Sequence, residues 1–84
     1  MNHKLKIWPE YYEAILEGKK TCEIRREDDR HFNVGDTLEL QPFDPKENVY
    51  LENKPLHVEV THIVREPWLP AGLAAMSIGG LEVE

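Results

Sequence analysis

A chain of 84 residues has room for one small domain, expected over residues 1–84, that buries only about 60 to 65 % of its unfolded surface. Hydrophobic residues make up 40 % of the sequence and charged residues 31 %, which excludes disorder as the default interpretation. The formal net charge of −6 argues against the broad, non-specific attraction to nucleic acid that is typical of strongly basic proteins.

The cellular compartment is predicted from the cysteine content and the apolar runs. Cys22 has no partner for an internal disulfide, which is compatible with a reducing compartment. No apolar run approaches the roughly 18 residues of a membrane span, and the N-terminus has too few apolar positions for a signal peptide. We therefore expect a cytoplasmic protein without a membrane partner.

The first residues predict a strand followed by a helix. Leu5 and Ile7 alternate with lysines, which indicates a short half-buried strand. Pro9 suits the first position of a helix, and the helix is expected to run to about Glu17 and to end at a left-handed Gly18. Its apolar stripe predicts that the helix lies across a sheet.

Residues 21–26 predict the second strand. Cys22 and Ile24 alternate with Glu23 and Arg25 in this segment. Because successive side chains of a strand point to opposite faces, we expect the apolar pair to enter the core and the charged pair to share the other face.

The remaining chain predicts short strands separated by turns. They are expected at residues 37–41, 49–51, 56–60 and 74–78. Pro42 is expected to begin a loop, His62 to mark a change of register, and Gly79-Gly80 to form a turn. One helix with five or six strands predicts an α+β, mainly β domain, built as a strongly curved sheet or barrel.

Positive charge is concentrated in one segment. Residues 19–26 carry four cationic side chains and one carboxylate, although the whole chain is acidic. A local basic patch of this kind favours selective binding over a short footprint.

The same segment carries a family resemblance. Gly18, Lys20, Glu23 and Arg25 match the Gly-x-Lys-x-x-Glu-x-Arg signature of ASCH domains, which belong to the PUA-like superfamily. The agreement continues through Trp8-Pro9, Ile15, Leu16 and Phe32-x-Val34-Gly35-Asp36.

The chain looks most like the compact DUF3850 branch of bacteria and their phages, from Leu5 to about Ile78. This resemblance implies a small PUA-like β-barrel of five or six strands with one principal helix near the N-terminus. It also implies that the helix and the signature strand line a cleft, and that the domain recognises RNA or a modified nucleotide.

The charged residues of the signature suit different roles in such a cleft. Arg25 could bind a phosphate or a guanine edge with two parallel hydrogen bonds, whereas Lys20 suits a mobile point charge. Glu23 could orient the Arg25 guanidinium or accept a hydrogen bond from a base amine. The alternative is a surface ion-pair ladder that contributes about 0 to 1 kcal/mol.

Aromatic and further polar residues are expected around the cleft. Trp8 and Tyr11 offer planes for base stacking, although Trp8 and Tyr12 are also candidates for the core. Arg26 and His31 are expected to border the site.

Other titratable residues predict no additional chemistry. His3, His57 and His62 are expected on strand surfaces, and Cys22 is expected to be a small core hydrophobe. No histidine and cysteine spacing suits zinc, so neither a metal nor another cofactor is expected.

Three function classes follow, and binding of RNA or a nucleotide without catalysis is the first. The second is an amidohydrolase acting on a modified nucleoside such as N4-acetylcytidine, with Lys20 and Glu23 as catalytic residues. Glu23 stands where that superfamily branch has a threonine nucleophile, which favours binding. The third is a protein-binding adaptor that uses Glu66-Pro67-Trp68-Leu69-Pro70, for which we expect Trp68 to close the core instead.

Overall fold

Strands dominate the computed structural model, which describes residues 1–83. The elements are β1 (Asn2–Ile7), α1 (Pro9–Leu16), β2 (Cys22–Arg26), β3 (Thr37–Asp44), β4 (Val49–Tyr50), β5 (Leu56–Val64) and β6 (Leu73–Val83). The expected mainly β fold with one principal helix is confirmed. No helix in the described residues is long and apolar enough to cross a bilayer.

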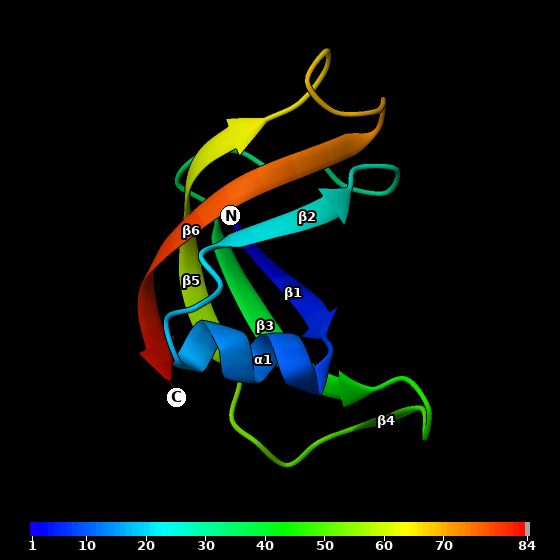
Figure 1. Ribbon diagram of the computed structural model, residues 1–84, viewed down its shortest axis with the longest axis vertical. Helices are drawn as coiled ribbons and strands as arrows, with labels where there is room; N and C mark the ends of the chain where they lie inside the picture. The colour runs from blue at the N-terminus through cyan, green and yellow to red at the C-terminus, as the bar shows by residue number, and fades with distance from the viewer. Residues whose placement is uncertain (84) are drawn as a thin grey trace.

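The strands form one sheet in the order β1-β3-β5-β6-β2, with β4 paired to the end of β3 (Figure 1). The β1 strand runs parallel to β3, and all other neighbours are antiparallel. The long β5 and β6 strands curve strongly (Figure 1), so the sheet wraps around its core.

The sheet is open, so the expected closed barrel is wrong. The edge strands are β1 and β2, and no ladder joins them in residues 1–83. Instead the Arg25 side chain reaches from β2 to β1, where its Nη2 donates to the Lys6 carbonyl at 2.9 Å. Hydrogen-bonded strands lie only about 4.8 Å apart, which leaves no room for a side chain between their backbones. The bridging position of Arg25 therefore fits two edge strands that are not paired with each other.

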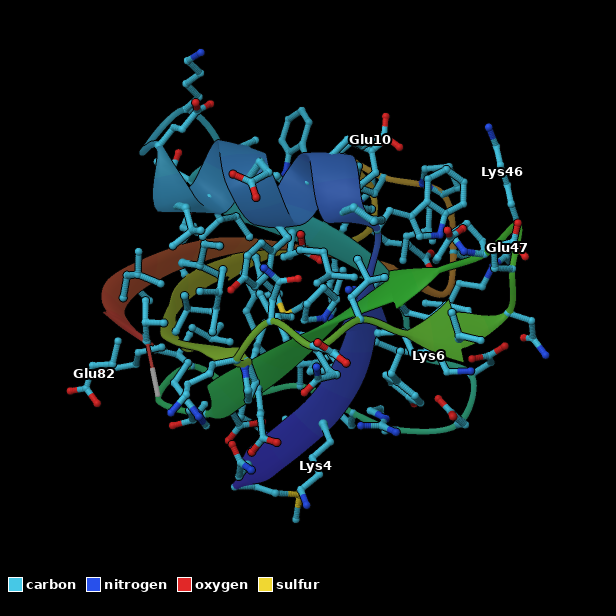
Figure 2. All side chains as sticks on the ribbon, turned by 90° about the horizontal axis from the view of Figure 1, so that it is seen from below. Lys4, Lys6, Glu10, Lys46, Glu47 and Glu82 are labelled. Atoms are coloured by element: carbon cyan, nitrogen blue, oxygen red, sulfur yellow. The ribbon has the colours of Figure 1, made fainter. Side chains whose placement is uncertain are left out.

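The helix α1 begins and ends as the sequence predicts. Pro9 occupies its first turn, and Gly18 follows it with a φ of 77°, a conformation that glycine adopts without a steric penalty. The buried Tyr12 and Ile15 belong to the hydrophobic core, and the Tyr12 hydroxyl donates to the Lys54 carbonyl at 2.8 Å. Figure 2 shows α1 as a layer on one side of the strands.

Two predicted chain breaks lie inside strands. The β3 strand continues through Pro42 because its ladder with β5 ends at Leu40, so the missing N–H of proline removes no bond to β5. The β6 strand continues through Gly79-Gly80 as a bulge, in which Gly80 has a φ of 61°. The register change expected near His62 is confirmed between Val60 and His62.

His3 is buried, which contradicts its expected place on the strand surface. It lies on the same face of β1 as Leu5 and Ile7, which is the face turned toward the hydrophobic core. Its Nε2–H donates to Asp36 Oδ2 at 2.8 Å. Burial opposes ionisation of Asp36, but hydrogen bonds from His3, from the Asn33 N–H and from the N-terminal ammonium outweigh it and lower the Asp36 pKa to about 2.

Glu27 fixes the connection between β2 and β3 to the end of β5. Its two carboxylate oxygens accept from Arg65 Nε at 2.6 Å and Arg65 Nη2 at 2.9 Å, and Oε2 also accepts from the Phe32 N–H at 2.8 Å. The hydrogen bonds from Arg65, followed by that from Phe32, outweigh burial and lower the Glu27 pKa from 4.5 to about 2. The same pair raises the pKa of Arg65.

These two carboxylates predict a loss of stability in acid. Because folding lowers their pKa values, the stability they contribute is complete above about pH 4.5 and is lost as the pH falls towards about 2. We expect Glu27→Gln to be less stable than the wild type at neutral pH and to lose less stability between these pH values. Urea unfolding at several pH values measures both effects, with the exposed Glu47→Gln as the control. Parallel pH curves for wild type and Glu27→Gln would contradict the assignment.

Candidate functional site

A cleft of about 450 Å³ opens between the start of α1 and the edge strands β1 and β2. Its lining consists of Lys6, Ile7, Trp8, Tyr11, Lys20, Cys22, Glu23, Ile24 and Arg25. The volume falls within the range of about 300 to 1,000 Å³ that is common for small-molecule sites. Five of the residues expected at the site therefore line one cleft.

The charged face of β2 points inward, opposite to the expectation. Glu23 pairs with the buried Met76 of β6, and its exposed fraction is only 4 %, whereas Cys22 and Ile24 are exposed. Glu23 and Arg25 do share one face, as predicted. Directly paired residues of neighbouring strands point to the same face of a sheet. The register with β6 therefore places Glu23 on the same face as the buried Met76.

Glu23 holds both cations of the signature. Its Oε1 lies 3.1 Å from Lys20 Nζ, and its Oε2 accepts from Arg25 Nε at 2.9 Å. The Lys20 ammonium also donates to the Cys22 carbonyl. Glu23 is buried, and each of its carboxylate oxygens has a cationic partner. Lys20, Glu23 and Arg25 therefore form a partly buried ion cluster, which differs from the exposed ion-pair ladder considered as the alternative.

Two exposed aromatic rings stand beside the cluster. Trp8 and Tyr11 are 49 % and 46 % exposed, and their rings are nearly parallel at 12° with centroids 6.0 Å apart. Lys20 Nζ lies 5.5 Å from the Tyr11 ring centroid. The core alternative for Trp8 is therefore wrong, while Tyr12 is buried as expected.

Arg26 and His31 lie outside this cleft. Arg26 lines a neighbouring hollow that it shares with Arg25. His31 is exposed, and its Nδ1 lies 3.3 Å from Glu27, in the connection between β2 and β3. Trp68, expected to close the core, is 81 % exposed instead.

Lys6 is a site residue that the sequence did not indicate. Its side chain lines the cleft and its carbonyl accepts from Arg25. Alternation placed Lys6 on the outer face of β1, but only the open edge of the sheet makes that position part of a site.

The residues of the cleft offer hydrogen-bond donors, positive charge and aromatic surface. Residues 1–83 contain no group of three or more histidine, cysteine or acidic side chains placed to hold a metal ion. The donors, charges and rings of the cleft suit the chemistry of an anionic or planar ligand.

Fold and site together define a small mainly β domain with a basic, aromatic-lined cleft at the open edge of its sheet. The chain belongs to the DUF3850 family, a domain of unknown function whose family model matches residues 2–78. It is also similar to an uncharacterised 12.9 kDa protein in the GpA 3′ region of Escherichia phage P2, at 45 % identity over 38 residues. That match covers 45 % of this chain and 34 % of the relative, about a third of its length.

Loss of the Glu23 charge tests whether the ion cluster stabilises the fold. Glu23→Gln leaves Lys20 and Arg25 without their anionic partner in a poorly hydrated site, so we expect a loss of about 1 to 3 kcal/mol in the free energy of unfolding. Urea unfolding measures this value.

The matched control is Glu17→Gln, which removes the exposed pair with Lys19 at 3.4 Å and should cost about 0.5 kcal/mol or less. Equal losses in Glu23→Gln and Glu17→Gln would show that the cluster behaves as an ordinary surface pair.

Proposed function

We propose that this protein binds RNA or a modified nucleotide in the cleft, with a base against Trp8 and Tyr11 and an anionic group at Lys20 and Arg25. We also propose that its fold is an open variant of the PUA-like ASCH domain, as the signature around Lys20 indicates. The buried Glu23 between two cations, next to two exposed aromatic rings, is the observation that carries the proposal.

The contacts of Arg25 support a binding role. Its Nε and Nη2 each donate one hydrogen bond, to Glu23 and to the Lys6 carbonyl, which fixes the plane of the guanidinium. A guanidinium carries five N–H donors in a planar fork, so further donors remain for a phosphate or the edge of a base. Fixing this group before binding reduces the entropy that binding must overcome.

The exposed rings support recognition of a base. Trp8 and Tyr11 already lie nearly parallel, so both present flat surfaces in one orientation. Stacking of a base on an aromatic side chain contributes about 1 to 3 kcal/mol and tolerates any base.

Glu23 is poorly placed for catalysis. Both of its oxygens are engaged by cations, so neither is free to take a proton from water in this arrangement. The geometry therefore favours binding over the amidohydrolase alternative.

The exposure of Trp68 favours protein binding through the connection between β5 and β6 as a second candidate function. At 81 % exposure this ring contributes little to the core, and it is not among the residues that line the cleft. The two functions use different residues and can be separated by substitution.

Substitution of the cleft residues tests the proposal with short single-stranded RNA. We expect Lys20→Ala to weaken binding about tenfold and to reduce its dependence on salt, because a phosphate contact is lost. Fluorescence anisotropy at two salt concentrations measures both quantities. Lys19→Ala is the control, since Lys19 is exposed and paired with Glu17 outside the cleft. Binding that is unaffected by Lys20→Ala, or equally reduced by Lys19→Ala, would contradict the site.

The hydrolase alternative predicts a different result. We expect no release of acetate when the wild type is incubated with N4-acetylcytidine and the product is followed by chromatography. Release by the wild type that disappears in Glu23→Gln would replace the binding proposal with the amidohydrolase.

A further inference from the structure

The positive charge of this acidic chain gathers around the open edge of the sheet. Three neighbouring hollows lie there, of about 450, 500 and 350 Å³, and Arg25 lines all of them. Six of the ten lysine and arginine residues line at least one hollow. These are Lys4, Lys6, Lys20, Arg25, Arg26 and Arg30. The same hollows are also lined by the carboxylates Glu23, Glu39, Asp28 and Asp29, so cations outnumber acidic side chains there by six to four. The excess of positive charge therefore extends beyond the signature residues.

Two cations mark the boundary between the cleft and the second hollow. Lys6 and Arg25 line both, and Arg25 donates to the carbonyl of Lys6. Figure 2 shows Lys6 near the end of β1 that lies toward α1 and Lys4 farther along the strand. A ligand that passes from one hollow to the other must pass these two side chains.

The second hollow has an aromatic side chain of its own. Tyr50 of β4 lines it and is 57 % exposed. Phe43 packs edge-on against Tyr50 with ring centroids 5.1 Å apart, and Lys6 Nζ lies 4.3 Å from the Phe43 ring centroid and 5.7 Å from that of Tyr50. These contacts hold Tyr50 in place while much of its surface remains open.

We propose that the ligand is single-stranded nucleic acid that occupies both hollows, with one base at Trp8 and Tyr11 and the next base at Tyr50. The phosphate that links the two nucleotides lies at Arg25 and Lys6. This inference rests on the proposed function and names its substrate class, since a mononucleotide would use one hollow only.

The order of side chains along the edge supports this assignment. Aromatic, cationic and again aromatic groups follow each other, as base, phosphate and base do in a single strand. In a duplex the bases are stacked inside and cannot reach both platforms. An acidic peptide would use the cations but would gain little from two exposed aromatic subsites.

Binding of ligands of increasing length tests the inference. The probes are uridine 5′-monophosphate, 5′-phosphorylated diuridylate, an RNA duplex and a short polyglutamate peptide, measured by calorimetry against the full chain. We expect the dinucleotide to bind at least about tenfold more tightly than the mononucleotide, and the duplex and the peptide to bind more weakly than the dinucleotide.

Tyr50→Ala separates the second subsite from the first. We expect it to weaken dinucleotide binding about fivefold or more and mononucleotide binding less than about twofold, whereas Tyr50→Phe should keep the wild-type affinity. Trp68→Ala is the control for loss of an exposed ring and should change neither affinity. Urea unfolding of each variant establishes that the fold is retained.

The outcomes distinguish the two proposals. Equal affinities for the mononucleotide and the dinucleotide, or equal losses for both in Tyr50→Ala, would overturn the two-subsite assignment and leave the proposed function standing. Absence of binding by every nucleotide would overturn both. Peptide binding as tight as dinucleotide binding would identify the edge as a site for acidic protein segments instead.

Discussion

A buried carboxylate organises both the fold and the site. Glu23 is 4 % exposed, and a charge at that depth is stable only when it has partners of opposite charge. Lys20 and Arg25 supply them from the two sides, and Arg25 continues to the backbone of β1. The edge strands are thus linked by a side chain rather than by a ladder, which keeps a cleft between them.

Local sequence signals located the helix and the strands, but they misplaced the ends of β3 and β6 and did not determine which face of a strand is buried. Pro9 and Gly18 fixed the limits of α1 because both act through their own backbone conformation. In β2, alternation correctly placed Glu23 and Arg25 on one face. The apolar side chain of Ile24, however, led to the wrong prediction that Ile24 faces the core and Glu23 faces outward. The inward face is set by pairing with Met76, a contact far away in the sequence.

The candidate site was predicted only in part, again because some of its features depend on contacts between residues far apart in the sequence. The signature identified Lys20, Glu23 and Arg25, because their spacing within one short segment is visible in the sequence. Lys6 was missed, and Trp8 was also considered for the core, because their exposure follows from the open edge between β1 and β2. Whether a sheet closes depends on the relative placement of all its strands, which short-range patterns do not encode.

The strand order has a consequence for how the protein is made. The β1 and β2 strands form the two walls of the cleft and are close in sequence, but they lie at opposite ends of the order β1-β3-β5-β6-β2. Because β2 joins the sheet only through β6, residues 73–83 must leave the ribosome before the walls can face each other. The cleft therefore cannot form before β6 is synthesised, although the residues of both of its walls are made early.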